Sequence, residues 1–203
     1  MISIINYGLG NLGSIKNMCK WVGVECEIIS SKSEIEQANK ILLPGVGAFD
    51  KAMSNISDLG IKEVLDEKAL EDKIPILGIC LGMQLLTEKS EEGNFEGLGW
   101  IPGETVKFKF PDNKVKVPHM GWNIVNIKSD QKIVKDLGEE PRFYFVHSYY
   151  VKVQNEENKL LETNYGGIIF DSAIHKNNIY GAQFHPEKSH KFGMQLLKNF
   201  AEI

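Results

Sequence analysis

Short apolar runs alternate with helical patterns through the first 88 residues, and this alternation restricts the chain to few folds. The expected strands cover residues 2–6, 24–29, 41–43 and 74–79, and the helical patterns cover residues 11–22, 33–38, 49–56, 61–71 and 81–88. A helix between two strands returns the chain to the same edge of a sheet, so the strands pair in parallel. The first half therefore predicts an open, mainly parallel α/β sheet with helices on both faces.

The second half carries strand patterns that are separated only by polar or glycine turns. They cover residues 106–110, 123–127, 142–146, 150–153, 159–163, 167–174 and 179–184. Close spacing without helices indicates antiparallel pairing. A last helical pattern covers residues 189–201, with Ser189 as the expected N-cap and an apolar stripe of Phe192, Leu196, Leu197 and Phe200. No linker or repeat divides the sequence, so we expect a single domain over residues 1–203.

Composition excludes several classes of protein. The 203 residues contain 23 Lys+Arg and 27 Asp+Glu, and a net charge of −4 gives no reason to expect binding to nucleic acid or an anionic membrane. No apolar run approaches the ~18 residues of a membrane span, and the start lacks the features of a secretory signal. Three cysteines do not form a disulfide framework in a chain of this size. We therefore expect a reduced, cytoplasmic protein.

A glycine motif, GLGNLG at residues 8–13, lies between a strand and a helix and matches the dinucleotide-binding pattern. That interpretation also needs an acidic residue at the end of the second strand. This strand ends instead in Ile29, Ser30 and Ser31. The sequence therefore favours a tight turn whose glycines adopt positive φ, or a surface loop that contacts a partner.

The segment GICLG at residues 78–82 follows an apolar strand and precedes a helical pattern. This is the nucleophile-elbow pattern, with Cys80 at its apex. The flanking glycines allow a sharp turn, the helix start favours a thiolate, and the amide of Leu81 points to where an oxyanion forms. A buried structural cysteine is the alternative, and we assign it to Cys19 and Cys26. For Cys80 the glycines favour a nucleophile.

A nucleophilic cysteine needs a base, and the base needs an orienting carboxylate. His185 and Glu187 lie at the end of the last expected strand, with Pro186 fixing the turn between them. By themselves they are more typical of a surface ion pair. A parallel sheet can bring them beside Cys80, which completes a nucleophile, base and orienter set. Neither residue has further ligands nearby in the sequence, so a metal site is not favoured.

The segment PGVG at residues 44–47 follows the third expected strand, at the sheet edge where Cys80 also lies. Open α/β sheets bind their ligands at this edge. A Gly-Val-Gly turn presents backbone N–H groups and is a candidate second oxyanion donor. The alternative is a simple turn between a strand and a helix.

Together these motifs resemble the class I glutamine amidotransferases, whose glutaminases use a Cys–His–Glu triad. The matching segments are GICLGMQ at residues 78–84, PGVG at residues 44–47 and FHPE at residues 184–187. Within this family the chain is most similar to the glutaminase subunits of imidazole glycerol phosphate synthase, through YGLGNL, LPGVGAF, PHMGWN, YFVHSY and QFHPEKS. The resemblance implies a flavodoxin-like, mainly parallel sheet.

The resemblance also implies roles for the matching residues. Cys80 would attack the side-chain amide carbon of glutamine, His185 would move the proton, and Glu187 would orient His185. The oxyanion hole would be supplied by Val46, Gly47 and Leu81. The expected contacts to the α-amino and α-carboxylate groups of glutamine are Gln84, Glu92, Ser148 and Tyr149.

A partner is implied as well, because free ammonia is mostly protonated and unreactive at neutral pH. In this family the ammonia passes through a tunnel to a synthase. The most similar relatives have a (β/α)8-barrel synthase subunit as this partner, which here would make imidazole glycerol phosphate and AICAR in histidine biosynthesis. The residues expected to face that partner in a heterodimer are Asn11, Met120, Trp122, Asn123 and Lys188. The resemblance implies no cofactor and no metal.

Three alternatives stay open at this point. Asn6 stands where the histidine enzymes often have Asp, and the segment GLGWI at residues 97–101 is also similar to amidotransferases that supply ammonia for acetamidino sugars of bacterial surface polysaccharides. A Cys-elbow esterase or redox-type chaperone is a second alternative, although Leu81 stands where redox relatives have histidine. The third is a nucleotide-binding module in which Cys80 is inert.

Overall fold

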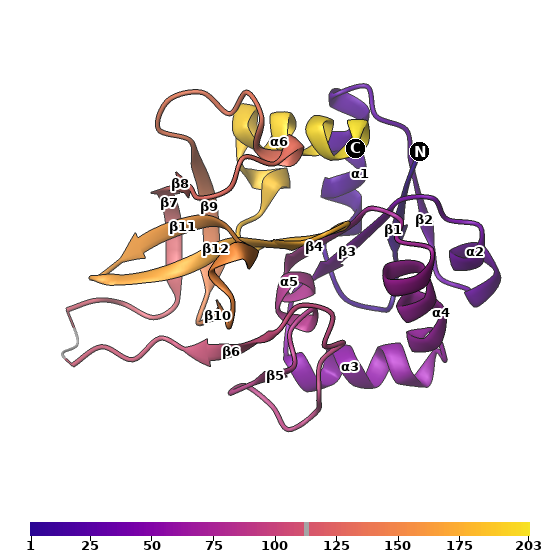
Figure 1. Cartoon of the computed structure of the whole chain (residues 1–203), viewed down its shortest axis with the longest axis horizontal. Helices are drawn as coiled ribbons and strands as arrows, with labels where there is room; N and C mark the ends of the chain where they lie inside the picture. The colour runs from indigo at the N-terminus through magenta and orange to yellow at the C-terminus, as the bar shows by residue number, and fades with distance from the viewer. Residues whose placement is uncertain (112–113) are drawn as a thin grey trace.

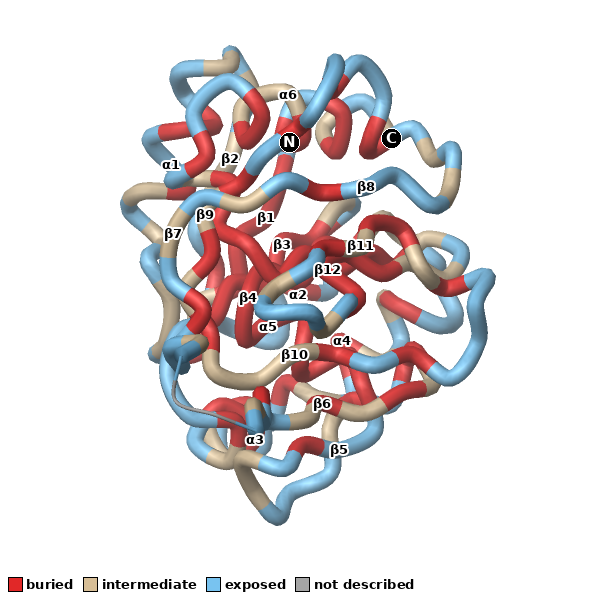
Figure 2. The backbone as a smooth tube through the Cα atoms, turned by 90° about the vertical axis from the view of Figure 1, so that its left-hand side faces the viewer, coloured by how far each residue is buried: buried red, intermediate tan, exposed pale blue. Residues whose placement is uncertain are grey.

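A twisted sheet runs through the computed structural model, which describes residues 1–111 and 114–203 (Figure 1). Five neighbouring strands of this sheet are parallel, in the order β2 (Cys26–Ile29), β1 (Ile2–Ile5), β3 (Ile41–Gly45), β4 (Ile76–Cys80) and β13 (Ile179–Ala182). Their side chains are mostly buried, as expected for strands covered on both faces. Figure 2 shows β1, β3 and β4 in the buried interior. The predicted mixed α/β class with a mainly parallel open sheet is confirmed.

Helices cover both faces of the parallel strands. On one face lie α1 (Leu12–Trp21) and α6 (His190–Glu202), which contact each other and lie together at the top of Figure 1. The other face carries α2 (Lys32–Glu36), α3 (Phe49–Asp58), α4 (Lys62–Asp66), a π-helical turn (Glu67–Glu71) and α5 (Leu81–Leu85). Each face has its own apolar cluster. No helix in the described ranges is long and apolar enough to cross a bilayer.

The second half extends the sheet mainly with antiparallel strands. After β13 follow β12 (Ile168–Lys176), β10 (Tyr149–Val153), β6 (Gly103–Lys107) and β5 (Lys89–Ser90), while β11 (Lys159–Tyr165) and β8 (Asn126–Ile127) branch from β12. A separate ribbon joins β7 (His119–Ile124) to β9 (Arg142–His147). Short 3-10 turns cover Lys132–Val134, Glu156–Asn158 and Pro186–Lys188.

Three sequence-based expectations need correction here. The close spacing of the second-half strands predicted antiparallel pairing, but β13 pairs in parallel with β4, and the short strand β5, which was not expected, pairs in parallel with β6. The strand expected at residues 123–127 is instead divided between β7, which starts at His119, and β8. Ser189 occupies the N-cap position of α6 without capping it, because its Oγ donates to the His185 carbonyl and accepts from the Tyr144 N–H.

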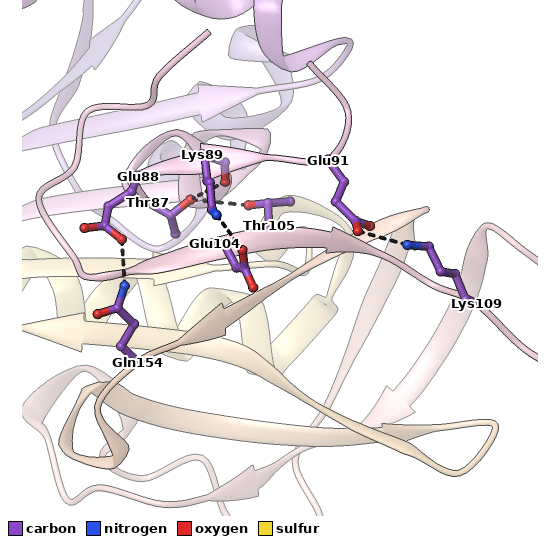
Figure 3. A network of polar contacts seen from close by, with 8 residues as sticks. All are labelled: Thr87, Glu88, Lys89, Glu91, Glu104, Thr105, Lys109 and Gln154. Carbon is purple, nitrogen blue, oxygen red and sulfur yellow. Dashed lines mark hydrogen bonds and ion pairs between the residues drawn. The ribbon is translucent and has the colours of Figure 1, made fainter. Parts of the chain in front are cut away.

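Polar contacts secure the outer edge of the sheet around β5 and β6, as Figure 3 shows. Ion pairs join Lys89 to Glu104 and Lys109 to Glu91. The Glu91 carboxylate also accepts the Lys107 N–H at 2.7 Å. Exposed pairs of this kind contribute little stability individually, but these fix the chain immediately before Glu92.

Candidate active site

The turn from β4 into α5 holds Cys80 at its apex. Cys80 has φ of 54° and ψ of −109°, a backbone conformation that non-glycine residues rarely adopt. The turn is also tight, because a Cβ atom on Gly82 would lie 1.8 Å from the Leu43 carbonyl oxygen. The structure therefore confirms the predicted elbow geometry, with Cys80 beside Gly45 in the register of β3.

The parallel pairing of β13 with β4 brings the expected base to the same sheet edge as Cys80. His185 follows the end of β13, and its Nδ1 lies 2.8 Å from Oε1 of Glu187. The side chains of the two residues are only 3% and 2% exposed. This burial excludes the surface ion pair that the two residues suggest by themselves.

The electrostatic environment favours a protonated His185. Burial by itself lowers the pKa of His185, but the neighbouring Cys80 thiol and the hydrogen bond to Glu187 outweigh burial and raise this pKa to about 10. Nε2 of His185 is buried without a hydrogen-bond partner of good geometry, but Cys80 lies close enough to raise the pKa of this ring. An imidazolium in this position stabilises negative charge on the cysteine sulfur.

A cavity of about 390 Å³ opens beside Cys80. Its lining includes nine residues predicted for the site: Val46, Gly47, Cys80, Leu81, Gln84, Glu92, Ser148, Tyr149 and His185. Lys188, Pro118, Val146 and His147 complete the lining. The structure thus gathers the predicted nucleophile, the predicted base and all the expected substrate contacts at one place, with Glu187 behind His185.

Backbone groups line the cavity on the β3 side. Leu81 begins α5, so its N–H has no partner within the helix and is free to meet an oxyanion. The PGVG turn lies opposite, with Gly47 at φ of 118°. Tyr7 donates a hydrogen bond of 2.6 Å to the Pro44 carbonyl, and burial raises the pKa of Tyr7 so that the hydroxyl keeps its proton.

The amide of Gln84 is oriented by two hydrogen bonds. Its Nε2 donates to the Tyr149 carbonyl at 3.2 Å and to Oε1 of Gln183 at 3.1 Å. Both amide protons are thereby used, which leaves the Gln84 oxygen as an acceptor for a ligand. Glu92 reaches the cavity from the loop after β5, and its carboxylate accepts the Phe49 N–H at 3.0 Å.

The residues predicted to face a partner lie mostly on one outer surface. Met120 is 62% and Trp122 is 45% exposed. The Trp122 ring stacks on His190, and Nζ of the exposed Lys188 lies 5.7 Å from the Tyr144 ring centroid.

Two residues of the predicted partner set are placed differently. Asn11 is exposed and caps α1, where its side chain accepts the Ser14 N–H. Asn123 lies in β7 with Met120 and Trp122, but its side chain points inward and donates to His119 and to the Asn164 carbonyl.

Sequence reasoning gave no role to several residues around the nucleophile. Gln183 donates to Sγ of Cys80 at 3.7 Å and accepts from Gln84. Tyr7, His119 and His147 also lie in segments that carry the family resemblance. The signal was therefore present in the motifs, but only the fold shows which of their side chains point toward the site.

Other sequence candidates lie outside this cavity. Gly8 and Gly10 adopt φ of 87° and 112°, which supports the tight-turn interpretation of the glycine motif. A larger cavity of about 840 Å³ between α3 and residues 94–99 has no cysteine or histidine in its lining. Cys19 is buried in α1 and Cys26 is half-buried in β2. Within the described residues, no group of three His, Cys, Asp or Glu is arranged to hold a metal ion.

Comparison with known proteins gives consistent results. The family described as "Glutamine amidotransferase class-I" matches residues 3–203. The chain is 54% identical over 200 residues to imidazole glycerol phosphate synthase subunit HisH 2 from Methanococcus maripaludis, covering 98% of both chains. It is 48% identical to the subunit of the same name from Pseudomonas aeruginosa, covering 100% of both. A solved structure of PurLQS from Thermotoga maritima has a TM-score of 0.76 at 16% identity, covering 99% of this chain and 97% of that chain.

Proposed function

The chain belongs to the class I glutamine amidotransferase family, and from this premise we propose that it is the glutaminase subunit of an imidazole glycerol phosphate synthase. The observation that carries the proposal is the cavity in which Cys80, His185 and the predicted glutamine contacts meet. The relatives named imidazole glycerol phosphate synthase subunit, which match over their full length, support the choice of synthase. Residues 1–203 then act as one type-1 amidotransferase domain in the cytoplasm, without a cofactor.

The triad performs an acyl transfer to sulfur. The Cys80 thiolate attacks the side-chain amide carbon of glutamine, and the carbonyl oxygen becomes an oxyanion held by the N–H groups of Leu81 and the Val46–Gly47 turn. His185 gives a proton to the leaving nitrogen, which departs as ammonia. Water then attacks the thioester with His185 as base, releasing glutamate and restoring the thiol. Val46 is the movable donor of this hole.

Substrate recognition uses the polar groups around the elbow. The free oxygen of Gln84 and the carboxylate of Glu92 accept hydrogen bonds from the α-ammonium group of glutamine. Ser148 and Tyr149 contact the α-carboxylate from the opposite wall of the cavity. The orientation of the Gln84 amide by Tyr149 and Gln183 supports this assignment.

Ammonia released in the cavity needs a protected route to its acceptor. We infer a heterodimer in which a (β/α)8-barrel synthase subunit receives it and forms imidazole glycerol phosphate and AICAR. The outer face with Met120, Trp122 and Lys188 supports this arrangement, because exposed aromatic and apolar side chains that cluster mark interaction surfaces.

A second acceptor is the acetamidino sugar precursor of surface polysaccharides. Asn6, which departs from the histidine enzymes, and the segment GLGWI at residues 97–101 are the features that favour this acceptor. The catalytic residues keep the same roles in either pathway, because the acceptor binds the synthase subunit.

Glutamate release from glutamine by the full chain, alone and with a soluble extract of its source, tests the proposal. We expect hydrolysis that Cys80→Ala and His185→Ala each reduce at least ~1,000-fold without loss of fold. Retained hydrolysis in either variant contradicts the mechanism. A co-purifying barrel protein that consumes a phosphoribosyl-formimino-carboxamide substrate supports the histidine pathway, whereas amination of a sugar substrate supports the second acceptor.

A further inference from the structure

Two buried histidines face each other across the β7–β9 ribbon, close to the glutamine cavity. His119 and His147 are register partners, with Nδ1 of His119 lying 3.0 Å from Nε2 of His147. The residues are 2% and 6% exposed. Buried polar pairs are retained where every donor and acceptor is satisfied, so the hydrogen bonds of this pair are informative.

Carbonyl oxygens at both ends fix the direction of the hydrogen bonds. Nδ1 of His147 lies 2.7 Å from the Tyr149 carbonyl, which only accepts, so His147 donates there and accepts at Nε2. His119 must then donate from Nδ1 and accept at Nε2. The Asn123 amide donates to this Nε2 at 3.3 Å and to the Asn164 carbonyl at 2.9 Å. The chain therefore runs in one direction, from Asn123 to Tyr149.

The surroundings keep both imidazoles neutral, as this chain requires. The His119 ring stacks on Tyr165 and Phe145 at centroid distances of 3.9 and 4.7 Å. Burial lowers the pKa of His119 to about 4 and that of His147 to about 3. Each ring then has one donor and one acceptor nitrogen at neutral pH.

The chain of hydrogen bonds ends in the glutamine cavity. The Tyr149 carbonyl that accepts from His147 also accepts from Nε2 of Gln84. Gln84 in turn donates to Gln183, which donates to Sγ of Cys80. His147 thus fixes the acceptor that sets the orientation of the Gln84 amide, and it lines the cavity itself.

We propose that His119 and His147 are positioning residues for glutamine recognition, holding the Tyr149 carbonyl and through it the Gln84 amide. The role rests on the proposed function. It deepens that function by linking the substrate site to β7, the strand whose outer side presents Met120 and Trp122. Neither histidine takes part in proton transfer.

Glutamine affinity of the full chain tests the role directly. Affinity is measured by calorimetry in the Cys80→Ser background, so that binding does not depend on hydrolysis. His147→Phe keeps a ring among the aromatic side chains but removes the donor, and we expect Kd to rise ~10-fold. His147→Asn places an amide donor near the Nδ1 position and restores most of the affinity. His119→Phe, which keeps the donor to Tyr149, raises Kd ~3-fold.

A matched control is His175→Phe. His175 stacks on Tyr180 near the start of β13, at the opposite end of the strand from His185. This variant keeps the wild-type Kd. The rate at which iodoacetamide alkylates Cys80 is measured in chains that keep this cysteine. In His147→Phe, His147→Asn and His119→Phe this rate stays within ~2-fold of wild type, because the elbow is unchanged.

Two outcomes overturn the positioning role. One is a folded His147→Phe and a folded His119→Phe that both bind glutamine as wild type does. The other is a parallel fall in glutamine affinity, alkylation rate and melting temperature, which marks a general packing defect. Failure of the proposed function gives a different result. If the His147 and His119 variants change the Kd for glutamine as expected but the wild-type chain never releases glutamate, only the glutaminase assignment is refuted.

Discussion

The elbow and the β7–β9 ribbon place residues in the same cavity by different physical means. At the elbow, backbone segments of β3, β4 and α5 approach so closely that Gly82 has no room for a side chain. In the ribbon, side-chain hydrogen bonds among Asn123, His119 and His147 fix the wall of the cavity. The proposed nucleophile is therefore held by steric contact, whereas the proposed substrate wall is held by hydrogen bonds of two titratable side chains, His119 and His147.

This difference gives the two regions different tolerances. A close-packed turn cannot relax around an added atom, because its neighbours are backbone atoms that the sheet itself fixes. One histidine of a hydrogen-bonded pair can be replaced by an aromatic ring of similar shape. The replacement loses the orientation of the hydrogen-bond partners but keeps the fold. Mutations that add volume should damage the elbow most, and acid should affect the ribbon most.

Gly82→Ala gives the largest expected effect, because the new Cβ would meet the Leu43 carbonyl oxygen at 1.8 Å. We expect a loss of ~4 kcal/mol or more in the free energy of unfolding, measured by urea denaturation. The control is Gly13→Ala in α1, where nothing lies within 4 Å of the added atom. That variant gains ~0.5–1 kcal/mol from helix propensity. Equal stabilities of the two variants would contradict a sterically determined elbow.

Glu187→Gln tests the polar support of the base. The amide keeps an acceptor for Nδ1 of His185 but removes the charge that favours the protonated ring. We expect kcat for glutamine hydrolysis to fall ~10–100-fold with a smaller change in KM. The matched variant is Glu157→Gln, an exposed site outside the cavity, which should keep the wild-type kcat. A normal kcat for the Glu187→Gln enzyme would show that His185 does not need the Glu187 carboxylate to orient it.

Acid should weaken the ribbon through its neutral histidines. The pKa values of His119 and His147 are lowered to about 4 and about 3, so the unfolded chain binds protons below pH ~6.5 that the folded chain does not. The contribution of each neutral histidine to stability is complete above its pKa in the unfolded chain, ~6.5. Below that pH the free energy of unfolding decreases as the pH falls, by up to ~1.4 kcal/mol per pH unit for each histidine. Thermal unfolding between pH 7 and pH 5 measures this slope.

His147→Phe removes one of these groups and should reduce the slope in the same pH range. His185, whose pKa is raised, gives a slope of the opposite sign near pH 7 and none below pH ~6, and this slope is common to His147→Phe and wild type, so it cancels in the comparison. Identical slopes for His147→Phe and wild type would show that His147 titrates normally in the folded chain.

Cys80→Gly gives the smallest expected effect. Glycine relieves the unfavourable φ and ψ of this position while it gains freedom in the unfolded chain, so we expect a net increase of ~1 kcal/mol in stability. Cys80→Ala keeps the unfavourable backbone and is the control. A Cys80→Gly variant no more stable than Cys80→Ala would mean that the elbow stores no strain.

The sequence by itself determined the parallel half of the sheet, the elbow at Cys80 and which residues belong to the proposed catalytic set. These features depend on short-range signals: apolar periodicity, glycines around one residue, and spacing within a motif. Such signals act over a few residues, so they are visible without knowing what packs against them. The same locality explains why Ser189 is the N-cap residue as expected but makes no capping hydrogen bond, since its hydroxyl accepts from Tyr144, 45 residues away.

Only the tertiary structure decided which distant segments meet. Parallel pairing of β13 with β4 places His185 beside Cys80, and the alternation of β7 turns Asn123 inward while Met120 and Trp122 stay outside. Burial of Glu187 and the orientation of Gln84 by Tyr149 follow from the same packing. Strand order depends on the packing and register of all strands of the sheet together, so it cannot be predicted from any short segment of the sequence.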